Sequence, residues 1–247
     1  MGSEDKSDIF NLPQHSKIFK TLNYTLFFPP MPDSLVPTRF LFRFSLPCRY
    51  RENLWSAKGT GLGEEFRLAS FAELENLPAA MDVRAAWSEA GVAFWVQVWG
   101  KKQAPWCRAS KPEDSDGFQV WIDTRDVHNV HRASRFCHQF LFLPAGGGKN
   151  LDEPAAFLVP INRAKELPHP LKPGLVKVRS EKKKDGYLLE AFLPAEALTG
   201  FDPVEHPRLG FNYALTDREL GEHTLTVGSP MPYDEDPSLW ATLELVN

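Results

Sequence analysis

The sequence predicts an all-β fold, namely an antiparallel two-sheet β-sandwich of jelly-roll type with short helical turns. Glycine and proline, 16 and 21 of the 247 residues, interrupt the chain at short intervals and leave little room for long helices. About a dozen short alternating or apolar segments lie between these breaks, as is typical of sandwiches. Helical patterns are limited to residues 70–77 and 194–198.

The clearest strand pattern covers residues 37–46, where Phe40, Phe42 and Phe44 recur with a period of two. An Asp-Gly pair at Asp185 and Gly186 joins two alternating segments and predicts a tight hairpin, because both positions tolerate positive φ. Further strands are predicted at 64–68, 82–87, 92–99, 117–123, 135–143, 156–160, 175–181, 186–193, 208–216, 223–227 and 239–246.

The first 35 residues differ from the rest of the chain. They contain Pro13, Pro29, Pro30 and Pro32 and no sustained hydrophobic period. We therefore expect residues 1–35 to form an extended or flexible N-terminal arm, and residues 36–247 to form a single β-sandwich domain.

Charge and hydropathy exclude several classes of partner. The formal net charge of −4 offers no basic footprint for nucleic acid or for an anionic membrane surface. No window approaches the roughly 18 apolar residues of a membrane helix. The N-terminus lacks the pattern of a secretion signal, so a cytoplasmic location is the default expectation, with another export route left open. The three cysteines cannot all pair with one another, which predicts no disulfide framework.

Histidine and cysteine gather between His128 and His138 and suggest zinc, since imidazole and thiolate are its preferred ligands. The spacing matches no known zinc finger. Cys137 and His138 point to opposite faces of a strand, and no second cysteine pair closes a site. Metal-assisted hydrolysis around His128, His131 and Cys137 is therefore the weakest hypothesis considered.

Carboxylates flank the strand predicted at 117–123. Asp116, Asp123 and Asp126 suit calcium, which accepts several carboxylates together with backbone carbonyls, although such residues also serve simply to form turns. A pair of carboxylates could also act as the acid and base of a glycosidase, but no spacing singles out a pair.

Tryptophan is more informative, with seven in the chain. Period two places Gln97 and Trp99 on one side of a strand, and Gln119 and Trp121 on one side of another. Indole and amide groups together suit a sugar ring, which has an apolar C–H face and a polar rim. The alternative is that the strand indoles belong to the core. Trp106 lies in a polar loop and is either a binding platform or a loop anchor.

Five stretches, in this order and spacing, resemble the family 9 carbohydrate-binding modules and the wider DOMON-like sandwiches around them. The resemblance covers roughly residues 50–247. The stretches are Asn-Leu-Trp at 53–55, Asp-Val-Arg-Ala-Ala-Trp at 82–87 with the strand after it, Asp-Gly-Phe-Gln-Val-Trp-Ile-Asp at 116–123, Leu-Gly-Phe-Asn-Tyr-Ala-Leu-Thr-Asp at 209–217 and Asp-Pro-Ser-Leu-Trp-Ala-Thr-Leu-Glu-Leu at 236–245.

The resemblance implies a module that grips the end of a glycan between two tryptophans and carries structural calcium. Trp106 occupies the first position by register, while the second falls near Tyr233 and Asp234, where no tryptophan stands. Gln119 replaces a glutamate typical of the family, and Ala214 replaces a hydrogen-bonding side chain.

The leading expectation is therefore a non-catalytic domain that binds a mono- or oligosaccharide, with a link to carbohydrate catabolism. Its predicted ligand-binding residues are Trp99, Trp106, Gln119, Tyr233 and Asp234. Any enzymatic role would be that of a part associated with a glycoside hydrolase. The alternative is a structural or interaction β-sandwich that has lost the sugar site.

Overall fold

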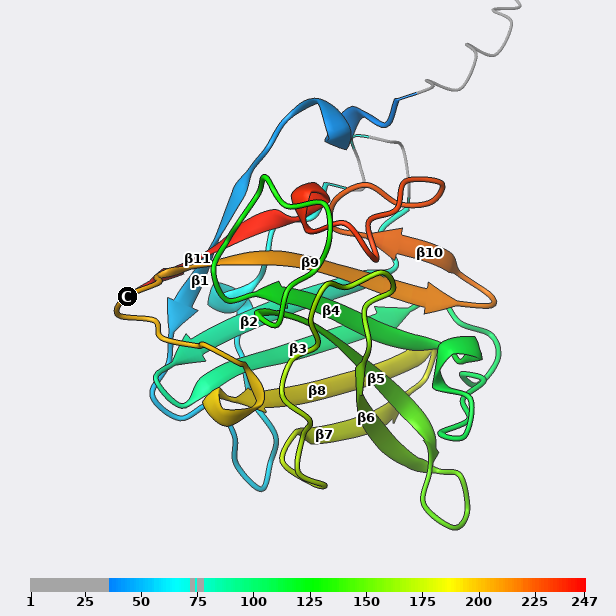
Figure 1. Ribbon diagram of the computed structural model, residues 1–247. Helices are drawn as coiled ribbons and strands as arrows, with labels where there is room; N and C mark the ends of the chain where they lie inside the picture. The colour runs from blue at the N-terminus through cyan, green and yellow to red at the C-terminus, as the bar shows by residue number, and fades with distance from the viewer. Residues whose placement is uncertain (1–35, 72–73, 75–77) are drawn as a thin grey trace, which may run out of the picture. The chain divides into compact units, whose positions relative to one another are not determined.

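The computed structural model describes residues 36–71, 74 and 78–247. The predicted arm at 1–35 and most of the helical pattern at 70–77 lie outside these residues. The described chain consists of strands and short 3-10 turns, which confirms the all-β class (Figure 1). The strands are β1 (Ser45–Tyr50), β2 (Met81–Ser88), β3 (Gly91–Trp99), β4 (Gly117–Asp123), β5 (Cys137–Gly147), β6 (Glu153–Val159), β7 (Lys177–Lys183), β8 (Gly186–Pro194), β9 (Arg208–Asp217), β10 (Gly221–Thr224) and β11 (Ala241–Val246), and the 3-10 turns are η1 (Thr38–Leu41), η2 (Glu64–Phe66), η4 (Pro112–Asp114), η5 (Ala195–Ala197) and η6 (Pro237–Leu239).

The strands form one hydrogen-bonded path in the order β6-β5-β4-β9-β11-β1-β2-β3-β8-β7, with β10 added to β9. The predicted division into two antiparallel sheets is not confirmed, because hydrogen bonds join all the strands of the described chain in one path. Strand β1 is parallel to both neighbours, pairing with β11 over Ser45–Arg49 and with β2 at Arg49 and Tyr50, so it joins the two halves. The hairpin of β5 and β6 lies against β7 and β8, which nearly closes the sheet around its core (Figure 1). The jelly-roll connection stays a prediction.

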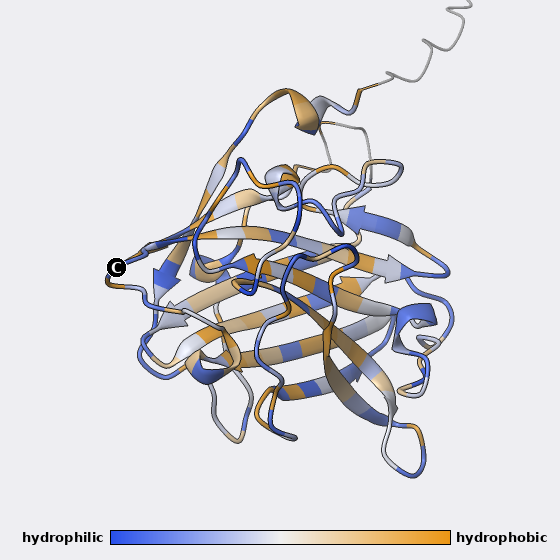
Figure 2. Ribbon diagram, viewed as in Figure 1, coloured by the Kyte–Doolittle hydropathy of each residue, from blue (hydrophilic) through white to orange (hydrophobic). Residues whose placement is uncertain are grey.

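The sheet has an inner face that holds the main core and an outer face covered in part by loops. Phe118, Val120 and Ile122 of β4 point into the core, so Gln119 and Trp121 between them point outward. Hydrophobic residues dominate the central strands, whereas β10 and many loops are hydrophilic (Figure 2). Two smaller apolar clusters lie on the outer face, one around Trp121 on β4 and β9 and the other on β2 and β3.

Two predicted strands are wrong. At 37–46 the chain forms η1 before β1, and Phe40 and Phe42 are exposed because no neighbouring strand pairs with this segment before Ser45. At 64–68 it forms η2, followed by a single bridge between Arg67 and Arg84. The Asp-Gly hairpin is confirmed as the turn between β7 and β8.

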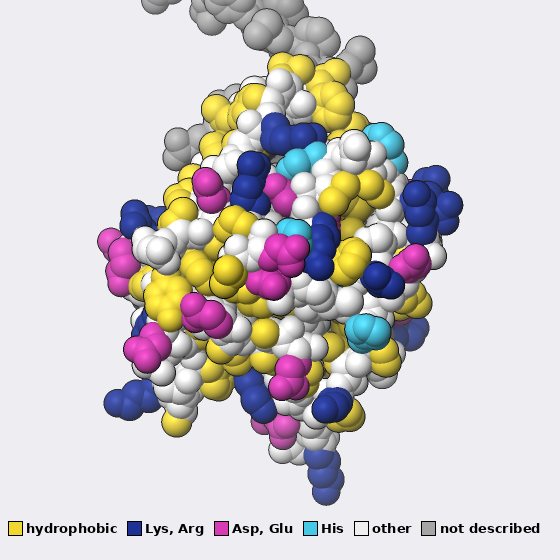
Figure 3. All heavy atoms as spheres, turned by 60° about the vertical axis from the view of Figure 1, so that its left-hand side comes forward, with side chains coloured by type: hydrophobic (Ala, Val, Ile, Leu, Met, Phe, Trp, Pro, Cys, Tyr) yellow, Lys and Arg dark blue, Asp and Glu magenta, His cyan; other side chains and the backbone are white. Residues whose placement is uncertain are grey.

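One face of the molecule shows acidic, basic and apolar side chains interspersed (Figure 3). Hydrophobic side chains gather toward the top of that view, and the exposed hydrophobic residues of the first described segment are Val36, Phe40, Leu41 and Phe42. Among the described residues, no helix has the length and apolar character needed to cross a membrane.

Candidate functional site

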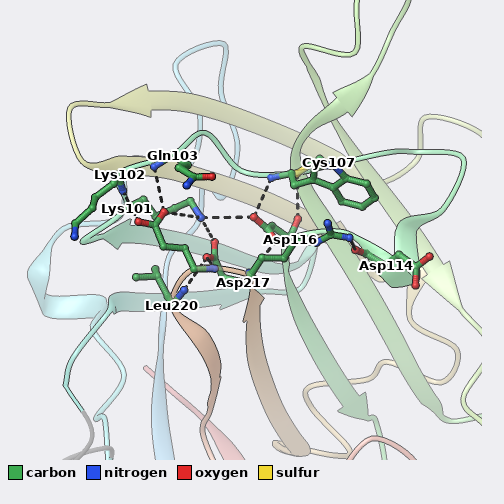
Figure 4. Close-up of polar contacts among 11 residues, drawn as sticks. Lys101, Lys102, Gln103, Cys107, Asp114, Asp116, Asp217 and Leu220 are labelled. Atoms are coloured by element: carbon green, nitrogen blue, oxygen red, sulfur yellow. Dashed lines mark hydrogen bonds and ion pairs between the residues drawn. The ribbon is translucent and has the colours of Figure 1, made fainter.

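The loop after β3 carries a buried ammonium group. Gly100 takes a φ of 87°, and the following Lys101 turns inward and is only 6% exposed. Its Nζ lies 2.5 Å from Asp217 Oδ2, 3.5 Å from Asp116 Oδ2 and 3.9 Å from Glu219 Oε2 (Figure 4). A buried amine survives only with such compensation, so these four residues, here called the Lys101 cluster, form one electrostatic unit.

The Lys101 cluster holds the backbone of Trp106 through Asp116. The N–H of Trp106 donates to Asp116 Oδ2 at 2.9 Å, and the N–H of Asp116 donates to the carbonyl of Trp106 at 2.8 Å. The N–H of Arg218 donates to the other oxygen, Asp116 Oδ1, at 3.0 Å. Figure 4 shows Asp116 between Lys101 and Cys107, whose thiol also donates to the Asp116 carbonyl. Asp116 therefore fixes two loops from one position.

The indole of Trp106 is half-buried and carries two arginines. The guanidinium carbon of Arg218 lies 3.5 Å from the ring centroid and that of Arg108 lies 4.6 Å from it. Both arginines are exposed, and neither pairs with a carboxylate among the described residues. Arg218 also donates to the carbonyl of Asp114 at 3.2 Å. The ring is thus a rigid support for cationic groups rather than a bare plane.

An amide row crosses the outer face of β5, β4 and β9. Gln139 Nε2 donates to Gln119 Oε1 at 2.8 Å, and Gln119 Nε2 lies 3.4 Å from Thr216 Oγ1. These residues come from β5, β4 and β9, and Ala214 pairs with Gln119 in the ladder. Each amide keeps donor and acceptor capacity beyond these contacts, so the row can hydrogen-bond to hydroxyl groups of a ligand.

Tyr233, predicted as the second aromatic plane, is 6% exposed. Its ring meets Trp121 edge-on at 5.5 Å, and its hydroxyl donates to Glu222 Oε1 at 2.6 Å. Burial, and then the bond to Glu222, raises the pKa of Tyr233. Asp234 is exposed, and its carbonyl accepts the indole N–H of Trp121 at 3.1 Å. The structure therefore places the Tyr233 ring in packing rather than in an open slot.

Trp99 lies apart from the residues just described. It ends β3, and four strands separate β3 from β4 in the sheet order. Because Val98 and Phe118 face the common core, Trp99 and Gln119 point away from it on different parts of the outer face.

The three predicted calcium ligands are not assembled. Asp116 precedes β4 and Asp123 ends it, which separates them by roughly 20 Å of extended chain. Asp123 accepts the N–H groups of Arg125 and Val127, and Asp126 lies 2.9 Å from His128 Nε2. These carboxylates do not fit one cation site, and Lys101 already compensates Asp116. Calcium binding elsewhere stays a prediction.

The histidine and cysteine segment is also divided among separate contacts. His131 Nδ1 lies 3.1 Å from Asp236 Oδ2, while Cys137 lies in the cluster with Trp121. Burial raises the pKa of Cys137 to about 12, which keeps its thiol protonated. Within the part of the chain that the structure describes, no three His, Cys, Asp or Glu side chains form a group that could hold a metal ion.

Comparison with known proteins bears on the fold. No family model matches the sequence, and no curated protein matches it. Two solved structures are similar, both of a family 9 carbohydrate-binding module from Caldicellulosiruptor kristjanssonii. The module in complex with cellotriose has a TM-score of 0.53 and 12% identity, and the match covers 82% of this chain and 94% of the module. The module in complex with glucose has a TM-score of 0.51 and 10% identity, covering 81% and 95%.

These matches confirm the predicted resemblance to family 9 carbohydrate-binding modules at the level of the fold. The described β-sandwich is the architecture of those modules, and the match spans nearly their whole length. At this identity the likeness says nothing of individual site residues. Their roles follow from the geometry of this chain alone.

Proposed function

We propose that this chain is a non-catalytic carbohydrate-binding domain whose site lies where the Trp106 loop meets the outer face of β4, β5 and β9. One observation carries the proposal: the Lys101 cluster anchors the backbone of Trp106, whose indole holds two exposed guanidinium groups, at the end of β4, the strand that also carries the outward amide Gln119. The fold likeness to modules that bind cellotriose and glucose supports it. An aromatic support together with several hydrogen-bonding groups suits a sugar ring.

Each group in this site has a specific task. Gln119, Gln139 and Thr216 supply donors and acceptors for ring hydroxyls. Arg108 and Arg218 supply exposed N–H donors, which the indole of Trp106 holds in place. A sugar ring stacks on the indole itself once one guanidinium moves aside. Tyr233 acts indirectly, because its hydroxyl orients Glu222 opposite Thr216 on the neighbouring strand.

The test is a titration with glucose and cellotriose followed by tryptophan fluorescence. We expect Trp106→Ala to lower the affinity at least about tenfold, or ~1.4 kcal/mol, because both the support and the arginine positions are lost. Gln119→Ala should weaken binding by a smaller factor and leave the fold intact. A flat titration of the intact chain across a broad glycan array contradicts the proposal.

A second candidate is a structural or interaction domain that has kept the sandwich without the sugar site. The buried ring of Tyr233 and the small Ala214 beside Gln119 favour it. Under this alternative Trp106 is a loop anchor, so Trp106→Ala lowers the thermal midpoint while no saccharide changes the fluorescence. Under the first proposal the midpoint of the intact chain rises with added ligand.

A further inference from the structure

A second concave site lies along β2 and β3, on a different part of the sheet from the Trp106 loop, and is lined by outward residues and by some residues of the core. Its cavity is about 620 Å³, within the range typical of small-molecule sites. Its polar and aromatic lining includes Glu64, Arg67, Asp82, Arg84, Gln97 and Trp99, and the core residues Leu68, Val83 and Tyr213 also line it.

The indole of Trp99 is held in one orientation. Its Nε1 donates to the carbonyl of Ala79 at 3.0 Å, and its backbone N–H donates to the carbonyl of Ala80 at 3.0 Å. The side chain is partly exposed and lines the cavity. Unlike Trp106, Trp99 has no guanidinium over its ring among the described residues. The described residues therefore leave part of this indole facing the cavity.

The polar groups beside Trp99 are incompletely satisfied. Arg84 Nε and Nη2 donate to Asp82 Oδ2 at 3.1 and 2.8 Å, and Arg67 Nη2 donates to the same oxygen at 3.0 Å. Asp82 Oδ1 is buried and receives no hydrogen bond. Gln97 stands opposite Asp82 in the ladder of β2 and β3, and its amide has no partner in the described chain. Unmet polar groups of this kind indicate a missing ligand or water.

The charge of the lining selects the chemical class of the ligand. The carboxylates of Glu64 and Asp82 repel an anion, and the guanidinium groups of Arg67 and Arg84 repel a cation. A purely apolar molecule would leave the polar groups of the rim without partners. What remains is a neutral ligand with an apolar face and several hydroxyls. We infer that the Trp99 cavity is a second saccharide site, which binds a neutral hexose unit on the indole with a hydroxyl directed to the amide of Gln97.

The experiment reads the two sites separately. With ¹⁵N-labelled tryptophan, the chain should give one indole N–H resonance for each of its seven tryptophans. Trp99→Phe and Trp106→Phe assign two of these, and the intact chain is then titrated with glucose, galactose, mannose and cellotriose to tens of millimolar. We expect the Trp99 resonance to shift and saturate. Gln97→Ala should weaken that saturation about fivefold, and Gln119→Ala should leave it unchanged.

Each outcome distinguishes this inference from the proposed function. If the Trp106 resonance shifts and the Trp99 resonance does not, the second site is overturned and the first stands. If only Trp99 responds, the second site stands and the Trp106 site falls. A Trp99 shift that Gln97→Ala does not weaken also overturns the inference, because the indole would then report a change elsewhere.

Discussion

Trp106 and Tyr233 are two loop aromatics that the family resemblance places as partners, yet the chain holds them in opposite ways. Trp106 is held through its backbone by buried charges, which leaves its ring at the rim with two arginines on it. Tyr233 is held through its ring, which packs against Trp121, and through its hydroxyl. A ring held by its backbone can meet a ligand, whereas a ring buried in packing contributes to the stability of the fold.

The largest expected effect comes from Lys101→Met, which removes the charge that anchors the Trp106 side. Asp116 and Asp217 would remain buried without compensation, so the free energy of unfolding should fall by about 3–5 kcal/mol. Urea denaturation measures this change. Lys102→Met is the matched control, since Lys102 is exposed and its side chain makes no described contact. Equal losses of unfolding free energy in the two variants would show that the Lys101 cluster does not anchor the Trp106 loop.

Tyr233→Ala should have the next largest effect. It should lower the free energy of unfolding by about 3 kcal/mol, because it removes a buried aromatic ring. Tyr233→Phe keeps the ring and loses only the bond to Glu222, so about 1–2 kcal/mol is expected. The same denaturation series tests both. The contrast between Trp106 and Tyr233 is contradicted if Tyr233→Phe abolishes the fluorescence response to saccharides and leaves the free energy of unfolding unchanged. The Tyr233 hydroxyl would then act in binding.

Arg218→Gln should have the smallest effect on stability, less than about 1 kcal/mol, because it removes one guanidinium–indole contact at an exposed site. Its main effect is optical. Removing the cation 3.5 Å from the Trp106 centroid exposes the indole and should increase quenching of tryptophan fluorescence by acrylamide. Arg125→Gln is the control, since Arg125 stacks on Phe136 rather than on a tryptophan. Unchanged quenching would mean that Arg218 does not shield the ring.

Local patterns predicted the strands well where each strand has a partner. The segment 117–123 forms β4 with the predicted bounds, and the Asp-Gly turn joins β7 to β8. At 37–46 the same alternation fails, because period two describes a strand only when another strand lies beside it. The outward position of Gln119 followed from alternation, but its neighbour Gln139 needed the pairing of β4 with β5.

The Lys101 cluster had no signal in the sequence. Lys101 and Lys102 are adjacent and look alike, yet one is buried among carboxylates and the other is exposed. Asp217 lies 116 residues from Lys101, so their contact depends on how the ends of β3 and β9 meet. Arg218 on Trp106 was missed for the same reason, because it follows the far end of β9, whereas Arg108 is only two residues from Trp106 in the sequence.

By itself, the amino-acid order determined that the chain is built of short strands, which residues of a strand share a face, and which family of modules it resembles. These properties are local or additive, since they depend on turn residues and on the two-residue period of extended backbone. The tertiary structure alone decided which aromatic ring stays at the surface and which is buried. That outcome depends on charges and rings brought together from distant strands, and the hydrophobic periodicity of the sequence does not predict such long-range contacts.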